Sequence, residues 1–175
     1  CSYALEMSLK KGATHARVAA TSNNANGMSV LNDSLETIEK AVDSSLTLHL
    51  FVEGRYGTCS TNKVDPSGLD KLLDDAIASV KLLAPDPFRK LVPKELRYEG
   101  PPLYSAHSGS VDTGVKKAFL LDCACAIWNK EPALISVMAD YSDHRQWLHL
   151  ADSDGLHCTS EETWYNYSVE CTFRG

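Results

Sequence analysis

Three residues near the end of the sequence, His149, His157 and Cys158, have side chains that bind zinc, and they lie on strands that we predict to be neighbours. Neighbouring strands can bring two side chains within ligand distance of one ion. However, successive residues of a strand point to opposite faces, so at most one of His157 and Cys158 can join His149. Because zinc needs three or four well-placed ligands, the pattern indicates surface or packed residues rather than a metal site.

Carboxylate and serine side chains form two further groups that could support catalysis. The aspartates near two predicted turns are Asp140, Asp143, Asp152 and Asp154, and the serines beside His107 are Ser105, Ser108 and Ser110. Paired carboxylates can perform acid–base chemistry, but turn formation explains these aspartates completely. A serine nucleophile would need an elbow motif around it, which is absent. We therefore predict no catalytic, cofactor-binding or metal-binding residue in this sequence.

The composition excludes several classes of function. The 175 residues carry a net charge of −6, and basic residues never cluster beyond a pair such as Lys10-Lys11. Phosphate binding needs a basic surface, so we expect no direct contact with nucleic acid. We assign four aromatic residues to sheet packing instead: Trp147, Trp164, Tyr165 and Tyr167. No apolar run approaches the roughly 18 residues that suggest a membrane span, so we expect no membrane partner.

The six cysteines indicate reduced thiols rather than a disulfide framework. They are Cys1, Cys59, Cys123, Cys125, Cys158 and Cys171, and none forms a Cys-x-x-Cys pair. Cys123 and Cys125 lie about 200° apart on a predicted helix, so they cannot share an ion or a disulfide. Reduced cysteines are typical of cytosolic proteins, and we expect a cytoplasmic location.

The run Gly54-Arg55-Tyr56-Gly57 is either a ligand clamp or a tight turn. It follows an aliphatic strand, and residues 58–62 can pair back as a return strand. Phosphate-binding loops need more glycines and a following helix, which this run lacks. We therefore predict a hairpin turn whose glycines take positive φ.

The first half of the sequence contains helix and strand patterns in alternation. A helix is predicted at residues 3–11 with Gly12 as its C-cap. Short strands follow at 15–21, 28–32, 35–42 and 46–53, with the Asn-rich run 22–27 as a turn. The clearest helix begins with Asp65 as N-cap and Pro66 as first residue. Its apolar residues keep helical spacing from Leu69 to Leu83.

The second half repeats this order after a Pro-rich connector at residues 85–109. A helix at about 112–129 has apolar residues on more than one stripe, which predicts broad burial. Strands follow at 133–141, 146–151, 156–159 and 163–173, with a hairpin turn at Asp-Ser-Asp-Gly. We infer an α+β fold of duplicated helix-plus-antiparallel-meander halves, about 1–84 and 110–175, with helices packed on antiparallel sheets.

The order of these motifs resembles the amino-terminal region of the TldD/PmbA family, formerly described as modulators of DNA gyrase. The matching motifs are the strand ending in Gly-Arg-Tyr-Gly, the Ser-Thr-Asn before the Asp-Pro helix start, and Asp86-Pro87 after that helix. The distal run from Ile135 to Gly175 is similar to the family's strand, its Asn/Asp-Ser-x-Gly turn and its Thr-x-Tyr strand. The resemblance covers nearly all of residues 1–175, and Asp86-Pro87 looks closer to the PmbA branch.

The resemblance implies that this sequence is the amino-terminal domain of a longer protein whose second, catalytic β domain is missing here. The first residue, Cys rather than Met, fits that expectation. In catalytic members the second domain binds zinc through a His-Glu-x-x-x-His helix and a distant Cys, with the Glu as general base. His144 and His149 share the His-to-His spacing, but Arg145 stands in place of the glutamate. We therefore expect no cofactor here and zinc only in the missing domain.

Two functions stay open at this stage. The resemblance implies either the non-catalytic domain of a zinc metallopeptidase that processes unfolded or modified-precursor peptides, or a domain of a zinc-less PmbA-type structural or binding partner subunit. A His-Glu-x-x-x-His motif further along the longer chain would discriminate the two. We expect this fragment to be inactive alone, to bind extended peptide at a strand edge, and to pair with a second copy or a related family chain.

Overall fold

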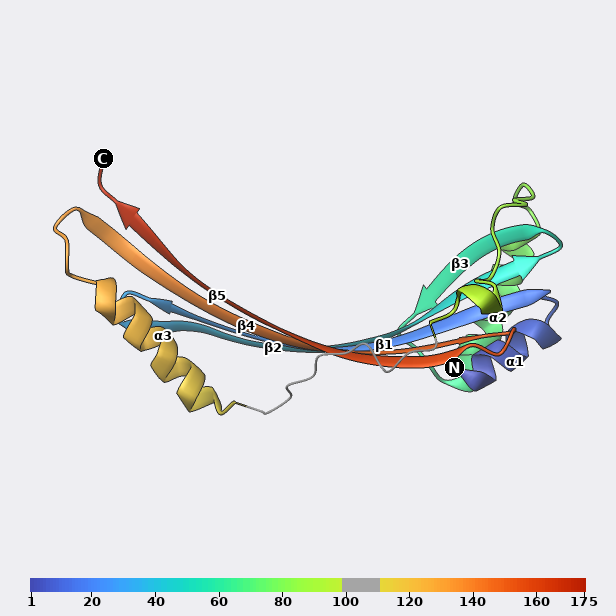
Figure 1. Cartoon of the computed structure of the whole chain (residues 1–175), viewed down its shortest axis with the longest axis horizontal. Helices are drawn as coiled ribbons and strands as arrows, with labels where there is room; N and C mark the ends of the chain where they lie inside the picture. The colour runs from blue at the N-terminus through green and yellow to red at the C-terminus, as the bar shows by residue number, and fades with distance from the viewer. Residues whose placement is uncertain (99–110) are drawn as a thin grey trace. The chain divides into compact units, whose positions relative to one another are not determined.

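The computed structural model describes residues 1–98 and 111–175 of the chain. Within these residues the helices are α1 (Ser2–Lys10), α2 (Pro66–Val80) and α3 (Thr113–Ile127), with a short 3-10 turn η1 (Lys94–Leu96). The strands are β1 (His15–Leu31), β2 (Ser34–Val52), β3 (Arg55–Thr61), β4 (Leu134–Asp152) and β5 (His157–Phe173). They form one sheet in the order β3-β2-β1-β4-β5 (Figure 1). The predicted α+β fold is confirmed.

Neighbouring strands of this sheet run antiparallel. β2 and β3 pair in register from Leu46–Thr61 to Val52–Arg55. β1 and β2 are joined at Asn32, which takes a φ of 61°, and β4 and β5 are joined by the predicted Asp-Ser-Asp-Gly turn, where Gly155 takes a φ of 87°. Tight turns of this kind connect antiparallel strands.

The strands are longer than the sequence pattern predicts. Residues 22–27, predicted as a turn, lie inside β1, and the predicted breaks within β2, β4 and β5 are absent as well. Polar contacts between strands replace apolar burial in this run. Asn26 donates to Asp143 over 2.7 Å, and Ser44 donates to Ser22 over 3.1 Å. Because asparagine and serine find partners across the sheet, their turn preference does not end the strand.

The chain divides into two compact units, each made of several segments. Unit 1 comprises residues 1–22, 43–104 and 147–161, and unit 2 comprises residues 23–42, 105–146 and 162–175. Each unit has its own hydrophobic core. The sequence boundaries predicted for two repeats, 1–84 and 110–175, and for the connector, 85–109, stay predictions, and residues 99–109 of that connector lie outside the described part.

The core of unit 1 lies between α2 and the aliphatic face of β2. Leu48, Leu50 and Val52 are fully buried on the strand, and Leu73 is fully buried on the helix. Asp65 caps α2 as predicted, because its carboxylate accepts a hydrogen bond from the backbone of Gly68 over 2.8 Å. The predicted apolar stripe of this helix ends at Val80 rather than Leu83, since Leu83 lies beyond the helix and is half exposed.

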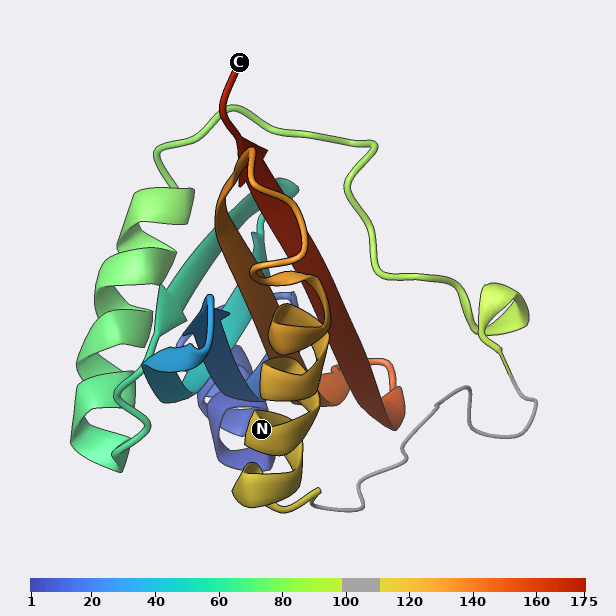
Figure 2. The ribbon, with the colours of Figure 1, turned by 90° about the vertical axis from the view of Figure 1, so that its left-hand side faces the viewer.

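The core of unit 2 lies between α3 and the strands β1 and β4 (Figure 2). Leu120 and Ala124 of the helix are buried against Val30 and Val137. The prediction of a broadly buried helix is wrong, because these are the buried residues of α3, and Phe119 on another stripe is 43% exposed. The sheet touches only one side of this helix, so its remaining apolar stripes stay open to solvent.

Among the described residues, every helix is too short or too polar to cross a membrane. The six cysteines all lie in the described part and are free thiols.

Candidate functional site

The Gly-Arg-Tyr-Gly run is a hairpin turn followed by an edge strand. Glu53 and Gly54 form the tip, with φ values of 50° and 74°. Arg55 is held by its neighbours, because its Nε donates to the carbonyl of Leu83 over 2.9 Å. A side chain held in this way is not poised for a ligand, so the predicted turn is confirmed.

Gly57 serves a purpose that the sequence prediction missed. Its φ is not positive, and it pairs with Leu50 of β2 close to the hairpin turn. A Cβ atom built on Gly57 would lie 2.5 Å from the Cγ2 atom of Val80. Gly57 therefore allows the end of α2 to approach β3 closely. The predicted positive φ is right for Gly54 and wrong for Gly57.

The histidine and cysteine side chains of the described residues do not fit a metal centre. The rings of His149 and His157 lie edge to face with their centroids 6.2 Å apart, but no third ligand joins them. Indeed, no group of three or more His, Cys, Asp or Glu side chains within residues 1–98 and 111–175 is placed to hold an ion. The structure therefore supports no chemical step through a metal in this part of the chain.

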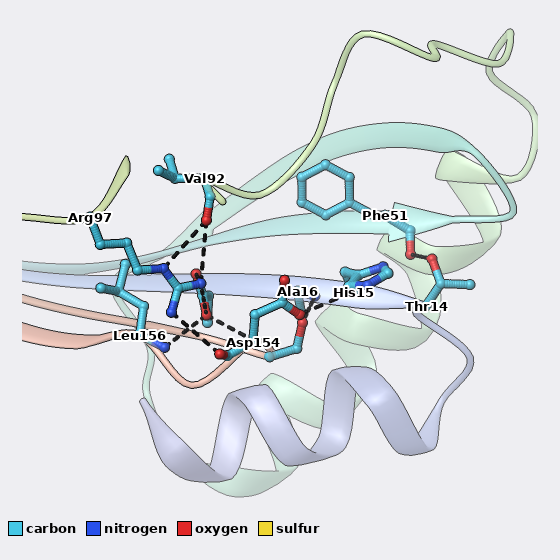
Figure 3. A network of polar contacts seen from close by, with 10 residues as sticks. Thr14, His15, Ala16, Phe51, Val92, Arg97, Asp154 and Leu156 are labelled. Atoms are coloured by element: carbon cyan, nitrogen blue, oxygen red, sulfur yellow. Dashed lines mark hydrogen bonds and ion pairs between the residues drawn. The ribbon is translucent and has the colours of Figure 1, made fainter. Parts of the chain in front are cut away.

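The predicted turn role of the aspartates is right for Asp152 and Asp154 and wrong for Asp140 and Asp143, which lie inside β4. The side chain of Asp152 is completely buried, and Oδ1 accepts hydrogen bonds of 2.9 Å from the backbone amides of Asp154 and Leu156. Arg97 lies against the other oxygen, with its Nη2 atom 3.3 Å from Oδ2 (Figure 3). The same guanidinium donates to the carbonyl of Val92. This buried ion pair fixes the segment around Val92–Arg97 to the β4–β5 turn.

A group of polar side chains on the second face of β1, β2 and β3 was not foreseen from the sequence. His49 Nδ1 and the hydroxyl of Tyr56 lie 2.7 Å apart, and the guanidinium of Arg89 lies 5.1 Å above the Tyr56 ring. Burial, together with the charge of Arg17, lowers the pKa of His49. The Nε and Nη2 atoms of Arg17 are buried and have no hydrogen-bond partner among the described residues.

A signal for this group exists in the sequence. Arg17 alternates with the buried residues Ala16 and Val18, so the period of the strand places it on the opposite face. That face then carries Arg17 on β1 and His49 on β2. The position of Arg89 comes from the connector, whose path has no sequence period.

An open groove of about 590 Å³ lies within unit 1 and crosses β1, β2, β4 and β5. We call it the hydroxyl groove. Larger side chains line it from β4, with Trp147 and His149, and from the segment before α2, with Val64. Its hydroxyl groups occur on three of these strands and include Thr21, Ser22, Ser44, Ser45, Thr159 and Ser160.

Four hydroxyls of the hydroxyl groove are paired with each other. The hydroxyls of Thr21 and Ser45 lie 2.8 Å apart, and Ser44 donates to Ser22. The carbonyl of His149 accepts the thiol of Cys1 over 3.7 Å. The ring of His149 makes no hydrogen bond to a serine or threonine of the described residues, so no nucleophile–base pair is formed.

The remaining sequence candidates do not form a site in the described part. Ser105, Ser108, Ser110 and His107 lie outside the described residues. The prediction that aromatic residues pack in the sheet is wrong for Trp164, Tyr165 and Tyr167, which are between 42% and 73% exposed. β5 is an edge strand, so its side chains have sheet neighbours on one side only.

Comparison with known proteins shows which family and which solved structures this chain is similar to. Residues 16–80 match the model of PmbA/TldA metallopeptidase domain 1. None of the curated proteins compared with this chain matches it. A crystal structure of a candidate modulator of DNA gyrase from Bacteroides thetaiotaomicron is 28% identical over 99% of this chain, with a TM-score of 0.92.

Two more distant solved structures share the fold. TldE from Thermococcus kodakarensis is 14% identical over 98% of this chain, with a TM-score of 0.74. A candidate modulator of a DNA gyrase from Thermotoga maritima is 12% identical over 99% of this chain, with a TM-score of 0.72. The chain spans 40%, 38% and 42% of the lengths of these three proteins. Whether it is closer to the PmbA or the TldD branch stays a prediction, and the likeness to the PmbA/TldD family rests on the match to the family's first domain at residues 16–80 and on these three structures.

Proposed function

We propose that this chain is a non-catalytic, peptide-binding domain of a PmbA/TldD-type metallopeptidase that processes unfolded or modified-precursor peptides. The observation that carries the proposal is the hydroxyl groove, an open cavity of about 590 Å³ built across four strands. A groove of this size accommodates several residues of an extended chain. Its paired hydroxyls and apolar side chains favour binding by shape over recognition of charge.

The chemistry of peptide cleavage then belongs to another part of a longer protein. The proposal rests on two features of the described residues: the His149–His157 pair has no third ligand, and the groove has no nucleophile–base pair. Zinc, where a family member uses it, is proposed to bind outside residues 1–175. This domain would supply binding surface for the substrate.

A second candidate function is that of a structural or binding subunit that pairs with a related, catalytic chain. The edge strand β5 favours this candidate, because it carries exposed Trp164 and Tyr167 and offers backbone groups for pairing. A second copy of the chain or a related family chain is the proposed partner. Modulation of DNA gyrase is a description of the relatives, and the cytoplasm is the compartment we propose from the free cysteines.

Peptide binding is tested by filling the hydroxyl groove. Ser44 is exposed and lines the groove, whereas Thr58 is exposed on β3 outside it. We expect Ser44→Trp to weaken binding of a fluorescent, unfolded casein-derived peptide by about tenfold or more, because the indole occupies the cavity. The matched control Thr58→Trp should bind as the unchanged chain does, with both variants checked for folding by circular dichroism. Equal binding by the two folded variants would overturn the groove assignment.

A further inference from the structure

A second groove lies entirely within unit 2, where the first turn of α3 approaches β1, β2, β4 and β5. Its volume is about 320 Å³. We call it the basic groove. The residues that carry the argument are Asn26, Lys40, Lys116, Asp143, His144 and Arg145.

The charge of the basic groove is opposite to that of the whole chain. Lys40, Lys116 and Arg145 line it together with one carboxylate, Asp143, although the chain has a net charge of −6. Such a local excess of cations attracts an anion. A polyanion such as nucleic acid is disfavoured, because the rest of the chain carries more acidic than basic residues.

Asp143 is already satisfied by protein partners. Its carboxylate accepts hydrogen bonds from Asn26, over 2.7 Å, and from the ammonium group of Lys116. Burial alone would raise the pKa of Asp143, but the hydrogen bonds from Lys116 and Asn26 outweigh it and lower the pKa. The carboxylate therefore stays ionised and holds Lys116 at the wall of the groove.

Lys40, unlike Lys116, is not held by a carboxylate of the described residues. It is exposed, and it makes no hydrogen bond or ion pair with another described residue. It lies on β2 and lines the same cavity as Lys116 of α3. An incoming carboxylate can therefore reach the Lys40 ammonium without breaking a protein contact.

An apolar recess continues the basic groove. A smaller cavity of about 130 Å³ shares Lys40 and Lys116 with it. Met28, Ile38 and Tyr141 also line this cavity, together with one carboxylate, Glu39. Lys116 lies 5.2 Å from the centroid of the Tyr141 ring. A ligand that fits both cavities carries an anionic group beside an apolar one.

We propose that the basic groove of unit 2 binds a carboxylate of an extended peptide, with an apolar residue of that peptide in the adjoining recess. Lys40 supplies the first charge contact and Lys116 the second, while Asp143 positions Lys116. This site is distinct from the hydroxyl groove of the proposed function, because it selects for acidic groups and belongs to unit 2.

The site is tested with three fluorescein-labelled peptides of sequence Gly-Leu-Xaa-Xaa. One has two glutamates and a free carboxyl end, one has two glutamates and an amidated end, and one has two glutamines and a free end. We expect the first to bind about tenfold more tightly than the glutamine peptide in fluorescence anisotropy. Amidation distinguishes the two sources of the bound carboxylate. A large loss of affinity on amidation shows that the carboxyl end binds, and a small loss shows that the glutamate side chains bind.

The variants localise the binding. Lys40→Gln should weaken binding of the glutamate peptide several-fold. Lys117→Gln, which removes a neighbouring charge on α3 that does not line the groove, is the matched control. Equal affinity for all three peptides, or equal losses in Lys40→Gln and Lys117→Gln, would overturn the proposal.

Discussion

At the scale of single residues, Gly57 shows how a small side chain determines packing. Replacing it by alanine places a Cβ atom 2.5 Å from Val80 Cγ2, so α2 or β3 has to move. We expect Gly57→Ala to destabilise the chain by about 1–3 kcal/mol, the usual cost of overpacking, as measured by urea denaturation.

The control for Gly57→Ala is a second substitution that shortens the side chain of Val80. Val80→Ala removes the clashing methyl groups, so the double variant should recover much of the loss caused by Gly57→Ala. If the two losses simply add, the close approach to Val80 is not the reason for glycine at this position. Gly54→Ala, at a φ of 74° with no atom near the built Cβ, should cost about 1 kcal/mol for the backbone alone.

Asp143 gives a prediction for pH. Its pKa is lowered from 3.8 in the folded state, so its contribution to stability is complete above the ordinary pKa and is lost as pH falls through the folded value. We expect Asp143→Asn to be less stable than the unchanged chain at neutral pH, with the difference shrinking below about pH 4. A difference that stays constant down to pH 2 would show that the carboxylate charge contributes nothing.

Residue roles were predictable where they follow from a local rule. The cap at Asp65 and the turn at Gly54 depend only on neighbouring residues, so the sequence predicted both. Gly57 and Arg17 depend on what another element places opposite them, α2 in one case and the burial of a sheet face in the other. The strand period assigns Arg17 to a face of the sheet, but a single sequence does not show which partners meet it there.

At the scale of elements, the segment Val92–Arg97 is held by one buried ion pair. Asp152 is completely buried and Arg97 nearly so, and the carboxylate also caps the β4–β5 turn. We expect Asp152→Ala to destabilise the chain by about 3–5 kcal/mol, because an uncompensated guanidinium stays buried. Trypsin should then cut faster after Lys90, just before the released segment, and after Lys94 within it, as followed by mass spectrometry.

The matched control for Asp152 removes both charges. Arg97→Met with Asp152→Asn avoids the unpaired cation and should be more stable than Asp152→Ala. Trypsin cleavage after Lys90 at an unchanged rate in folded Asp152→Ala would contradict the anchoring role.

Element types were predicted well, and element lengths were not. The helix periods and the turn at Asp-Ser-Asp-Gly gave the order of helices and strands. Runs such as 22–27 were predicted as turns because asparagine and glycine favour them, yet Asn26 pairs with Asp143 across the sheet. A partner 117 residues away in sequence therefore overrides a local preference for a turn. The burial of α3 also depends on its neighbours in space, because the sheet covers one stripe of the helix.

At the scale of the whole molecule, we propose that these 175 residues bind peptide and that the cleavage chemistry belongs to another part of a longer protein. Two cores in two units support two separate grooves, one of them lined by hydroxyls and one by cations. The expectation of a metallopeptidase comes from the name of the matching family model. The described residues provide surfaces on which a peptide can bind.

The most direct test is peptide cleavage by the purified 175-residue chain in the presence of added zinc. Casein-derived peptides are incubated with the chain over a range of zinc concentrations, and the products are followed by mass spectrometry. The account predicts that the peptides stay intact at every zinc concentration, because no three ligands converge in the described part. Zinc-dependent cleavage that is lost on chelation and restored by zinc would contradict it.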